Sequence, residues 1–521
     1  MRFIPKALLK KTYNRGSLQN GDSVVRFSLK NRLAPATLET IDRIAIDGDG
    51  VEAGSVRVSL DGGEPLPLDR LTAGSPVDFP LGTLLTVSVD RPALEEGEHE
   101  IALEFTARPF GTLAFDVRDS LATGRRDPDA IPRSTENDHA HEVIARRQRF
   151  VREQTGSSLE HVSDFSFDPE TTKGNIEHLT GAAQVPLGVA GPLHVHGEHA
   201  RGAFYVPLAT TEGTLVASYN RGMKVIAASG GVKCAVVGDN MQRAPVFEFE
   251  DAATARRFAD WLVEHMDALR RVCTESDPFV ALKHVDYYLA ARFVFTRFNF
   301  TTGDAAGMNM VGKATFAACN WILQEAGEFE VRNFFLESNF ATDKKASQIN
   351  SMRTRGKRVV AECTVKRDVL RDVMDADTEQ LAQHARIANV GSMLSGANNN
   401  GCHAANAITA IFIATGQDVA NVAESSAGIL YTELTPDRDL YISITLPSLI
   451  VATVGGGTGL PTQRECLEMM GCAGAGKVMK LAEIVAGTVL AGEISLAAAI
   501  SSLDWVSSHD RYGRNDPTRA S

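Results

Sequence analysis

The sequence predicts an α+β protein in which an all-β sandwich domain precedes a larger, mixed α/β unit. Its 521 residues are too many for one compact core, so we expect two or three domains. Short β-rich runs separated by turn residues fill residues 20–120. After residue 154, Gly, Ala, Asn and Ser become dense and strand-like runs alternate with helical ones. Hydrophobic residues make up 44% of the chain and charged residues 23%, as in ordinary globular proteins.

The first 120 residues have the pattern of a β-sandwich. Strand-like runs occur at VVRFSLK, TIDRIAI, SVRVSL, TLLTVSV, HEIALEF and TLAFDV, and turns such as Asp47–Gly50 and Asp61–Gly63 separate them. Six or seven strands at a spacing of roughly 10–15 residues are typical of a sandwich. No constellation of His, Asp, Glu or Cys stands out in residues 1–120. We therefore expect an accessory domain there, whose candidate role is to bind a protein partner.

Residues 121–154 are interpreted as a linker and an entry helix. The segment is charged and polar, contains Arg125–Asp129, and has a helix-compatible run at Glu142–Glu153. The seven cysteines all follow residue 233, and no two of them have the CxxC spacing. We therefore expect neither a disulfide framework nor a metal site, but reduced thiols that act as small buried hydrophobes.

Neither a membrane anchor nor a nucleic-acid partner is expected. Ile484–Leu503 is the most apolar long stretch, but Gly487, Gly492 and Glu493 interrupt it, so it predicts a buried core helix. Met1–Lys11 lacks the apolar core of a secretion signal. The formal net charge of −12 and the pI near 5.6 disfavour binding to nucleic acid. We expect a cytoplasmic protein.

One candidate acid stands where a strand meets a helix. Glu212 is followed by Gly213 and by a helix-compatible run at Leu215–Ala228. An acid at such a junction can face a cleft, where burial would raise its pKa and suit it to proton donation. The alternative is an acid that complements the dipole at a helix N-terminus.

A candidate ligand loop follows the strand-like run Phe293–Phe298. It is the sequence DAAGMNM at Asp304–Met310. Gly307 permits close approach of a ligand to the backbone, and the two methionines supply an apolar, polarizable wall suited to a nicotinamide or a ribose. The alternative is a pair of ordinary core methionines.

Two further clusters supply opposite charges. In Thr342–Lys345, Lys344 is flanked by an acid and a second lysine, so it can stay charged and be aimed at a carbonyl oxygen that gains negative charge. Asp418 follows the apolar helical run Ala407–Ala414 and could bridge Glu212 and Lys344. The alternatives are a solvated charge run and an ordinary polar residue at a helix end. His403, just before that helix, is expected to orient a neighbour.

The last two motifs are a glycine-rich run and a histidine near the C-terminus. Thr453–Pro461 is neither a Rossmann fingerprint nor a P-loop, so a tight turn beside a ligand and a plain turn both remain open. His509 lies in a polar tail, from which it could move over a site and protonate a leaving thiolate. An exposed tail histidine without a function is the alternative.

In this order, the clusters resemble the hydroxymethylglutaryl-CoA reductase family over residues 137–515. The matching blocks are EHLTGAAQVPLGVAGPL, PLATTEGTLVASYNR, GDAAGMNM, TDKK, HAANAITAIFIATGQD and TVGGGTGLPTQ. Several long blocks in one order are far more specific than any single motif. The β-sandwich stands where eukaryotic members carry a membrane domain.

The resemblance implies domain boundaries and an assembly. A large domain that binds the CoA ester would take residues 155–243 and 337–495. A ferredoxin-like domain that binds the nicotinamide cofactor would be inserted at residues 244–336, and a tail at residues 496–521 would carry the catalytic histidine. The resemblance also implies a homodimer or a higher homo-oligomer.

The resemblance further implies a reaction and its residues. Hydroxymethylglutaryl-CoA would be reduced to mevalonate and free CoA by two hydride transfers from NADPH or NADH, without a metal. Glu212 would donate a proton, Lys344 would stabilise the oxyanion, Asp418 would tune both, and His509 would protonate the departing thiolate. The implied cofactor-binding residues are Asp304, Ala306, Gly307, Met308, Asn309, Met310, Asn220 and Arg221. The implied substrate-binding residues are Ser218, Arg243, Asp343, Lys345, His403 and Asn406.

Two departures from the family pattern concern the acyl group. Glu337 stands where membrane-anchored members carry a serine, and Ile387 stands where they carry a lysine. An acid gained and a cation lost would weaken the binding of a substrate carboxylate by Coulomb repulsion. A compensating cation would have to come from Arg243, Lys345 or Arg386.

A third departure concerns the cofactor. Asp277 stands where some NADPH-using relatives carry a serine next to an arginine, so it would disfavour a 2′-phosphate and favour NADH unless Arg221 supplies the cation. Two other functions remain open. One is a reductase of a related acyl-CoA in a specialised pathway, and the other is a catalytically weak scaffold whose β-sandwich recruits a partner.

Overall fold

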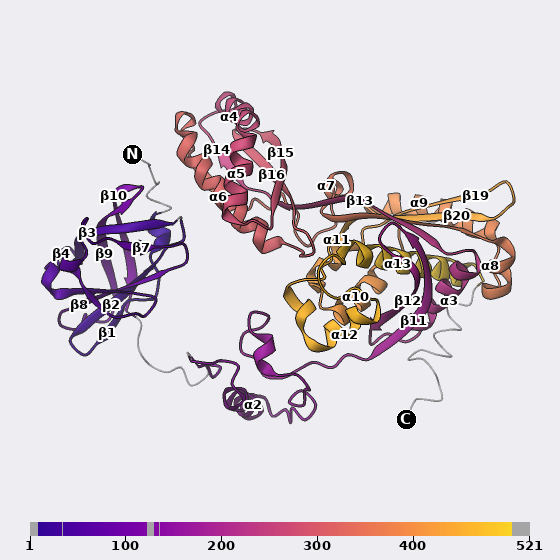
Figure 1. Ribbon diagram of the computed structural model, residues 1–521, viewed down its shortest axis with the longest axis horizontal. Coiled ribbons are helices and arrows are strands. Elements are labelled where there is room, and N and C mark those ends of the chain that lie inside the picture. Colours follow the sequence, from indigo (N-terminus) through magenta and orange to yellow (C-terminus); the bar gives the residue numbers. More distant parts are fainter. Residues whose placement is uncertain (1–8, 34, 122–129, 135, 503–521) are drawn as a thin grey trace. The chain divides into compact units, whose positions relative to one another are not determined.

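The computed structural model describes residues 9–33, 35–121, 130–134 and 136–502 (Figure 1). The chain divides into two compact units. One is made of Met1–Ala130 with Ala317–Glu330, and the other of Ile131–Phe316 with Val331–Ser521. His509 and the charged run Arg125–Asp129 lie outside the described residues.

Two five-stranded antiparallel sheets form the predicted β-sandwich among the described residues. The first has the order β1 (Gln19–Gly21), β2 (Val24–Lys30), β8 (Leu84–Asp90), β5 (Val56–Leu60), β6 (Leu66–Pro67). The second has the order β10 (Gly111–Ser120), β9 (Glu98–Arg108), β3 (Ala36–Ile46), β4 (Asp49–Gly50), and β7 (Val77–Phe79) pairs with β3.

Alternation explains why these residues form a sandwich. Along β9, buried residues alternate with half-buried or exposed ones, so one face joins the core that contains Phe27, Val87 and Ile101. The sandwich fold is confirmed. The short strands β1, β4, β6 and β7 were not predicted, because two or three residues carry too little alternation to be recognised.

Helix α2 (His141–Thr155) is the predicted entry helix, and Gly156 ends it in the left-handed conformation. Its Arg147 is fully buried. The guanidinium donates to the carbonyls of Pro132 and Leu179 at 2.8 Å each and forms an ion pair with Asp138. One side chain therefore ties the helix to the segments on both sides of it.

A small domain lies within residues 244–336 and has the ferredoxin-like order of elements. The chain order is β14 (Val246–Glu248), α4 (Ala252–Glu264), α5 (Met266–Ser276), β15 (Ala281–Ala290), β16 (Phe293–Thr301), α6 (Met308–Glu325), β17 (Asn333–Phe335). The strands pair antiparallel in the spatial order β17-β14-β16-β15, which is the ferredoxin-like arrangement that the resemblance implied, with two helices, α4 and α5, between the first two strands.

The large domain is built on a mixed sheet. Its strand order is β12 (Arg201–Ala209), β11 (Leu187–Gly197), β13 (Val232–Arg243), β18 (Gly356–Val365), β20 (Leu440–Leu449), β19 (Ile429–Leu434). Strand β13 pairs with β18 through Asn240 and then with β16 from Met241 to Arg243. This one strand therefore passes from the sheet of the large domain into that of the small domain.

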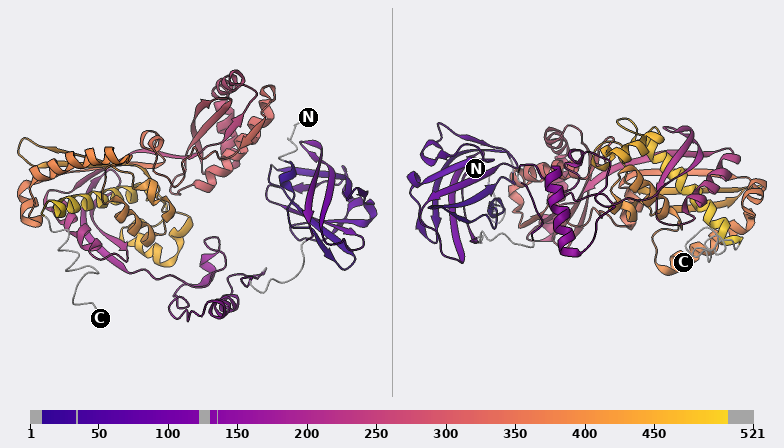
Figure 2. Two further views of the ribbon diagram at one scale, coloured as in Figure 1. Left: turned by 180° about the vertical axis from the view of Figure 1, so that it is seen from behind. Right: turned by 90° about the horizontal axis from the view of Figure 1, so that it is seen from below.

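Helix α13 (Val478–Ser501) is the core of the large domain. It packs on the sheet and against α3 (Leu215–Ala228) and α10 (Ala404–Thr415), as Figures 1 and 2 show. By length and composition it could cross a membrane, with a mean hydropathy of 1.8, but 78% of its most apolar window is buried inside the protein. It is the predicted core helix, and it continues six residues past the expected boundary at residue 495.

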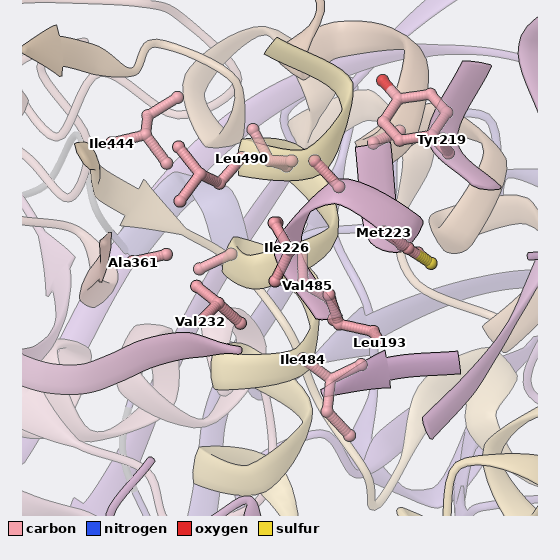
Figure 3. Packing of buried hydrophobic residues seen from close by; sticks show 14 of the residues in the cluster. Leu193, Tyr219, Met223, Ile226, Val232, Ala361, Ile444, Ile484, Val485 and Leu490 are labelled. Carbon is pink, nitrogen blue, oxygen red and sulfur yellow. The ribbon is translucent and has the colours of Figure 1, made fainter. Parts of the chain in front are cut away.

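The side chains around α13 are closely packed. Ile484, Val485 and Leu490 lie among Met223 and Ile226 of α3 and residues of the sheet (Figure 3). The backbones of α3 and α13 approach so closely at Gly222 that a Cβ atom there would lie 1.9 Å from the carbonyl oxygen of Ala491. The remaining helices cover the rest of the sheet and its loops: α7 (Gln348–Arg353), α8 (Arg367–Met374), α9 (Thr378–Ser395), α11 (Val422–Ser425) and α12 (Pro461–Met469).

All seven cysteines are free thiols. Six of them are buried, as predicted, but Cys402 is exposed. The backbone N–H of Cys402 is held by Glu493, whereas its side chain reaches solvent in the loop before α10. The prediction that all seven are buried was therefore wrong at this position.

Candidate active site

The turn at Thr342–Lys345 presents Lys344 next to an acid from a distant segment. The Nζ atom of Lys344 lies 3.4 Å from Oδ2 of Asp418, and both side chains are about half exposed. Asp418 follows α10 and caps the 3₁₀ turn Val419–Asn421, where it accepts the N–H of Ala420 at 3.1 Å. Asp418 is therefore a helix-end cap and also the partner of Lys344, which is one half of the bridge that the sequence suggested. The ion pair orients the lysine side chain while leaving it open to a ligand.

Glu212 does not have the predicted environment in the single chain. Its side chain is exposed, and it forms no ion pair with any described residue, so Asp418 does not bridge it to Lys344. It stands in the turn between β12 and α3, where its N–H bonds to Oγ1 of Thr210 at 3.0 Å. The carboxylate lies on the solvent side of that turn, and the expected burial is therefore absent.

A second cluster of predicted site residues surrounds Ser495 of α13. Oγ of Ser218 lies 2.9 Å from Oγ of Ser495 and 3.3 Å from Nε2 of His403. Arg221 donates to the carbonyl and the hydroxyl of Ser495, each at 3.1 Å. Asn406 lies 3.0 Å from Nδ1 of His403. Four predicted residues from two separate motifs are thus brought together on α3, α10 and the loop before α10.

Neighbouring side chains fix both the ring and the backbone of His403. Its ring stacks on Tyr219 at 4.7 Å between centroids, and its backbone carbonyl accepts the Tyr219 hydroxyl at 2.6 Å. Burial lowers the pKa of its imidazole to about 4, so the ring is neutral near pH 7. Glu493 accepts the backbone N–H groups of Cys402, His403 and Ala404 and so caps α10. The expectation that His403 orients a neighbour agrees with this geometry.

Asn220 lies beside this cluster on α3. Its Oδ1 accepts the N–H of Gly191 at 3.0 Å, which holds a bulge of β11 against the helix. Its side chain is exposed, so it can also reach a ligand.

The DAAGMNM run lines a cleft of about 570 Å³. Helix α6 begins at Met308, so Met308, Asn309 and Met310 form its first turn and their backbone N–H groups are unpaired within the helix. Gly307 has φ +78°, and a Cβ atom there would lie 2.3 Å from Thr302. The other wall contains Asp418 and the glycine-rich run, whose Gly456–Gly459 form a 3₁₀ turn. That run therefore lines the same cleft as the DAAGMNM loop.

This cleft suits a nicotinamide nucleotide. The start of a helix favours anions such as phosphate, and the glycines let a ligand approach the backbone. Apolar contact comes from Met308, Met310, Ile450 and Ala452. Among the residues that the structure describes, no group of three or more His, Cys, Asp or Glu side chains is arranged to hold a metal ion.

Asp304 anchors this loop rather than facing the cleft. Its carboxylate accepts the N–H groups of Gly476, Lys477 and Val478 at 2.8–3.1 Å, at the start of α13. Burial alone would raise the pKa of this carboxyl, but these hydrogen bonds outweigh it and hold the pKa below its usual value. Asp304 thus connects the ligand loop to the central helix of the large domain.

The charges around the turn show which cations could still meet a substrate carboxylate despite the acid at Glu337. Arg243 lies 2.9 Å from Asp343 and 3.6 Å from Glu337, so its charge is already shared by two carboxylates. Nζ of Lys345 bonds to Oδ1 of Asn339 at 2.9 Å and forms no ion pair with any described carboxylate. Of the cations considered for a substrate carboxylate, Lys345 and Arg386 form no ion pair with a described carboxylate, and Lys345 is the one next to Lys344 in the turn.

Ile387 and Asp277 also have definite positions. Ile387 lies on α9 and is 63% exposed. Asp277 ends α5 and accepts the N–H of Phe279 at 3.0 Å, which is a local turn, and it is not among the residues that line the cleft. Any effect of the Asp277 charge on the cofactor would therefore come from outside that cleft.

Sequence reasoning missed four residues that hold this site. They are Arg355, Glu424, Glu493 and Ser495. Glu493 did leave a signal, since a charged residue inside an otherwise apolar helix needs a buried partner. Glu424 and Arg355 occur in no recognisable motif.

Comparison with known proteins agrees with this geometry. The family model for hydroxymethylglutaryl-coenzyme A reductase matches residues 143–514, and the model for the N-terminal domain of hydroxymethylglutaryl-CoA reductase matches residues 8–122. The 3-hydroxy-3-methylglutaryl-coenzyme A reductase of Aeropyrum pernix is 43% identical over 410 residues, which cover 77% of this chain and 96% of that protein. The reductase of Methanothermobacter thermautotrophicus is 42% identical over 401 residues, covering 76% and 99%.

A solved structure has the same fold. The class II 3-hydroxy-3-methylglutaryl-CoA reductase of Streptococcus pneumoniae, bound to NADPH in open conformations, aligns with a TM-score of 0.53 at 20% identity and covers 69% of this chain and 94% of that chain. The family match spans more than half of the chain, and the curated relatives are matched over almost their full length. The chain therefore belongs to the hydroxymethylglutaryl-coenzyme A reductase family.

Proposed function

We propose that the chain reduces hydroxymethylglutaryl-CoA to mevalonate and free CoA in two hydride transfers. The reaction is that of the family, and one observation supports its assignment to particular residues of this chain. Asp418 both lines the cleft that suits a nicotinamide and pairs with Lys344, at 3.4 Å. A cation is thus held at the edge of the cleft, where a thioester carbonyl would meet a hydride donor.

Lys344 is proposed to stabilise the negative charge that develops on the carbonyl oxygen. A preorganised cation is effective there because it needs no rearrangement during the reaction. Asp418 would keep the ammonium charged and aimed. Glu212 would supply the proton to the alcohol product, and His509 would protonate the thiolate, which leaves more readily as the thiol.

The cofactor would lie between the first turn of α6 and the glycine-rich run. Gly307, Met308 and Asn309 would hold it, with Ala306 and Met310 beside them. When bound, a nicotinamide cofactor supplies hydride. NADPH is bound in the Streptococcus pneumoniae structure, and we propose NADPH or NADH for this chain.

The substrate is proposed to carry a carboxylate that meets Lys345. Arg243 is shared between Glu337 and Asp343, whereas Lys345 faces no described carboxylate within ion-pair distance. Ser218, His403 and Asn406 would contact the acyl group or the thioester from the cluster around Ser495. With these assignments Glu337 would not repel the substrate carboxylate, because Arg243 already neutralises its charge.

We further propose that the working enzyme is a cytoplasmic homodimer or a higher homo-oligomer. Helix α9 exposes four large apolar side chains: Ile387, Val390, Met393 and Leu394, each between 59% and 84% exposed. A stripe of this kind on one helix is typical of a surface that a second chain covers. A second copy would also give the exposed Glu212 neighbours that the single chain lacks.

The reaction is tested by steady-state oxidation of NADPH and NADH with hydroxymethylglutaryl-CoA and, in parallel, with other acyl-CoA esters. We expect turnover with hydroxymethylglutaryl-CoA and one preferred cofactor. Turnover only with another ester would refute the mevalonate assignment. No turnover with any acyl-CoA would leave the scaffold hypothesis.

The role of Lys344 is tested by Lys344→Ala against a matched control. Removal of an oxyanion partner typically lowers kcat by about 10²–10³-fold. Lys366 forms a comparable ion pair with Asp439 at 2.8 Å, outside the site, so Lys366→Ala should leave kcat unchanged. Equal activity of the two variants would contradict the assignment.

A further inference from the structure

Two fully buried charged residues contact the turn that presents Lys344. Arg355 precedes β18 and Glu424 lies in α11, and neither side chain has any exposed area. Nη1 of Arg355 lies 2.6 Å from Oε1 of Glu424, and the same oxygen accepts the backbone N–H of Lys344 at 3.0 Å. Nη2 of Arg355 lies 2.6 Å from Asp343. One ion pair therefore contacts two successive residues of the turn.

The backbone of this turn needs such support. Thr342 has φ +59° and Lys344 has φ +63°, which is the left-handed region that residues other than glycine rarely occupy. Such residues persist only where the surrounding structure holds them. Lys344 is one of these two strained residues, and Glu424 directly accepts its backbone N–H. Loss of the negative charge on that acceptor would weaken its bonds to this N–H and to Arg355, and would allow the turn to relax to ordinary dihedral angles.

Stability alone does not explain the pair. Buried ion pairs seldom add to stability, because removing two charges from water costs about as much as their attraction returns. Oε2 of Glu424 and Nε of Arg355 have no hydrogen-bond partner among the described residues, so the pair is not even fully satisfied. Burial also raises the pKa of the Glu424 carboxyl, which makes its charge harder to keep. The Arg355–Glu424 pair therefore needs an explanation other than stability.

We propose that Glu424 and Arg355 are positioning residues that fix the backbone of Lys344, so that its ammonium group points at the reacting carbonyl. The proposal rests on the role proposed above for Lys344. Neither residue touches the substrate, and both act through the lysine. The lysine side chain is about half exposed and is held at its end only by Asp418, so its direction depends on the backbone from which it starts.

The test compares Glu424→Gln with a second buried carboxylate. Glu483 is equally buried and accepts the N–H groups of Glu198, His199 and Ala200, in a turn without site residues. A misplacement of 1 Å in a site can lower the rate by about 10²-fold. We therefore expect Glu424→Gln to lower kcat about 10²-fold with little change in KM, and Glu483→Gln to leave kcat unchanged.

A double variant tests whether Glu424 acts through Lys344. In a Lys344→Ala background, Glu424→Gln should cause no further loss, because the group that it positions is already gone. A further loss as large as that in the wild-type background would overturn the proposal. So would an unchanged kcat in the single variant.

Amide hydrogen exchange gives a readout that needs no turnover. The segment 342–345 should exchange faster in Glu424→Gln than in the wild type, and at the wild-type rate in Glu483→Gln. If the wild type reduces no acyl-CoA, the proposed function fails, yet exchange still tests the restraint, and unchanged exchange would refute it. If Glu424→Gln does not fold, Arg355→Lys takes its place. It should also lower kcat and speed exchange of this segment, and wild-type values of both would overturn the proposal.

Discussion

Replacement of Gly222 by alanine should separate the two helices that carry one half of the site. A Cβ atom at this position of α3 would lie 1.9 Å from the carbonyl oxygen of Ala491 and 2.5 Å from its carbonyl carbon. These atoms belong to the backbone of α13 and cannot turn aside. Since Cβ contacts below 3.0 Å essentially do not occur, the helices must move apart by about 1 Å.

The cost can be estimated from the packing. Overpacking of a core costs about 1–3 kcal/mol, and a gap of about 1 Å forfeits a quarter to a half of the dispersion energy along the contact. Alanine returns about 1 kcal/mol through its higher helix propensity. Because neither backbone can turn aside, the upper end of that range applies, and we expect a net loss of about 2 kcal/mol. In a unit of this size, whose unfolding entropy is large, this lowers the Tm by about 2–3 °C.

The same movement should disturb the cluster around Ser495. Ser218 and Arg221 on α3 contact Ser495 on α13 across this seam, at 2.9 and 3.1 Å. Thermal unfolding followed by circular dichroism, with KM for hydroxymethylglutaryl-CoA, measures both effects. Gly54→Ala is the control, since Gly54 is exposed in the N-terminal unit with no atom near its Cβ position, and the substitution should leave the Tm of the unit that contains α3 unchanged. A Gly222→Ala protein that unfolds at the wild-type temperature would refute the reasoning.

Two further predictions concern the N-terminal unit and the assembly. Nδ1 of His99 lies 2.7 Å from the carboxylate of Asp47, and this hydrogen bond raises the pKa of His99. A raised pKa in the folded state stabilises the domain at pH values below the unfolded value of about 6.5, and this contribution is lost as the pH rises through the folded value. The Tm difference between wild type and His99→Gln should therefore be larger at about pH 5.5 than at about pH 9, and a constant difference would argue against the ion pair. On α9, Met393→Glu should convert the oligomer into monomers in light scattering at micromolar concentration, because it introduces a charge into the apolar stripe. Met469→Glu, at an exposed position on α12, should leave the oligomer intact, and a Met393→Glu protein of wild-type mass would refute the interface.

Local patterns identified most of the fold. Helix α3 has the predicted bounds, Leu215–Ala228, because its apolar residues recur at helical spacing and glycines follow its end. The longer strands of the sandwich were recognised from their alternation. The ordered motifs likewise predicted that Lys344 and Asp418 meet, although 74 positions separate them in the sequence.

Other features of the site could not be read locally. Glu212 was expected to be buried, yet it lies on the solvent side of its turn, and whether a residue in a turn is covered depends on chains packed against it. Asp304 was assigned to the cofactor by resemblance, but its carboxylate caps α13 at Val478, 174 residues away. Cys402 is exposed although the next residue, His403, is buried, and of Cys402 only the backbone N–H is held by Glu493.

The sequence by itself predicted the β-sandwich from the alternation of its strands, and its ordered motifs identified the family. The family resemblance in turn implied the inserted ferredoxin-like domain and the residues proposed for the reaction. Only the tertiary structure revealed what supports them. The Lys344 turn is held by Glu424, 80 residues away, and His403 is held by Glu493, 90 residues away. Residues such as Glu424 and Glu493 follow no local sequence pattern. Each is needed because a distant segment buries a polar group, which then requires a hydrogen-bond partner.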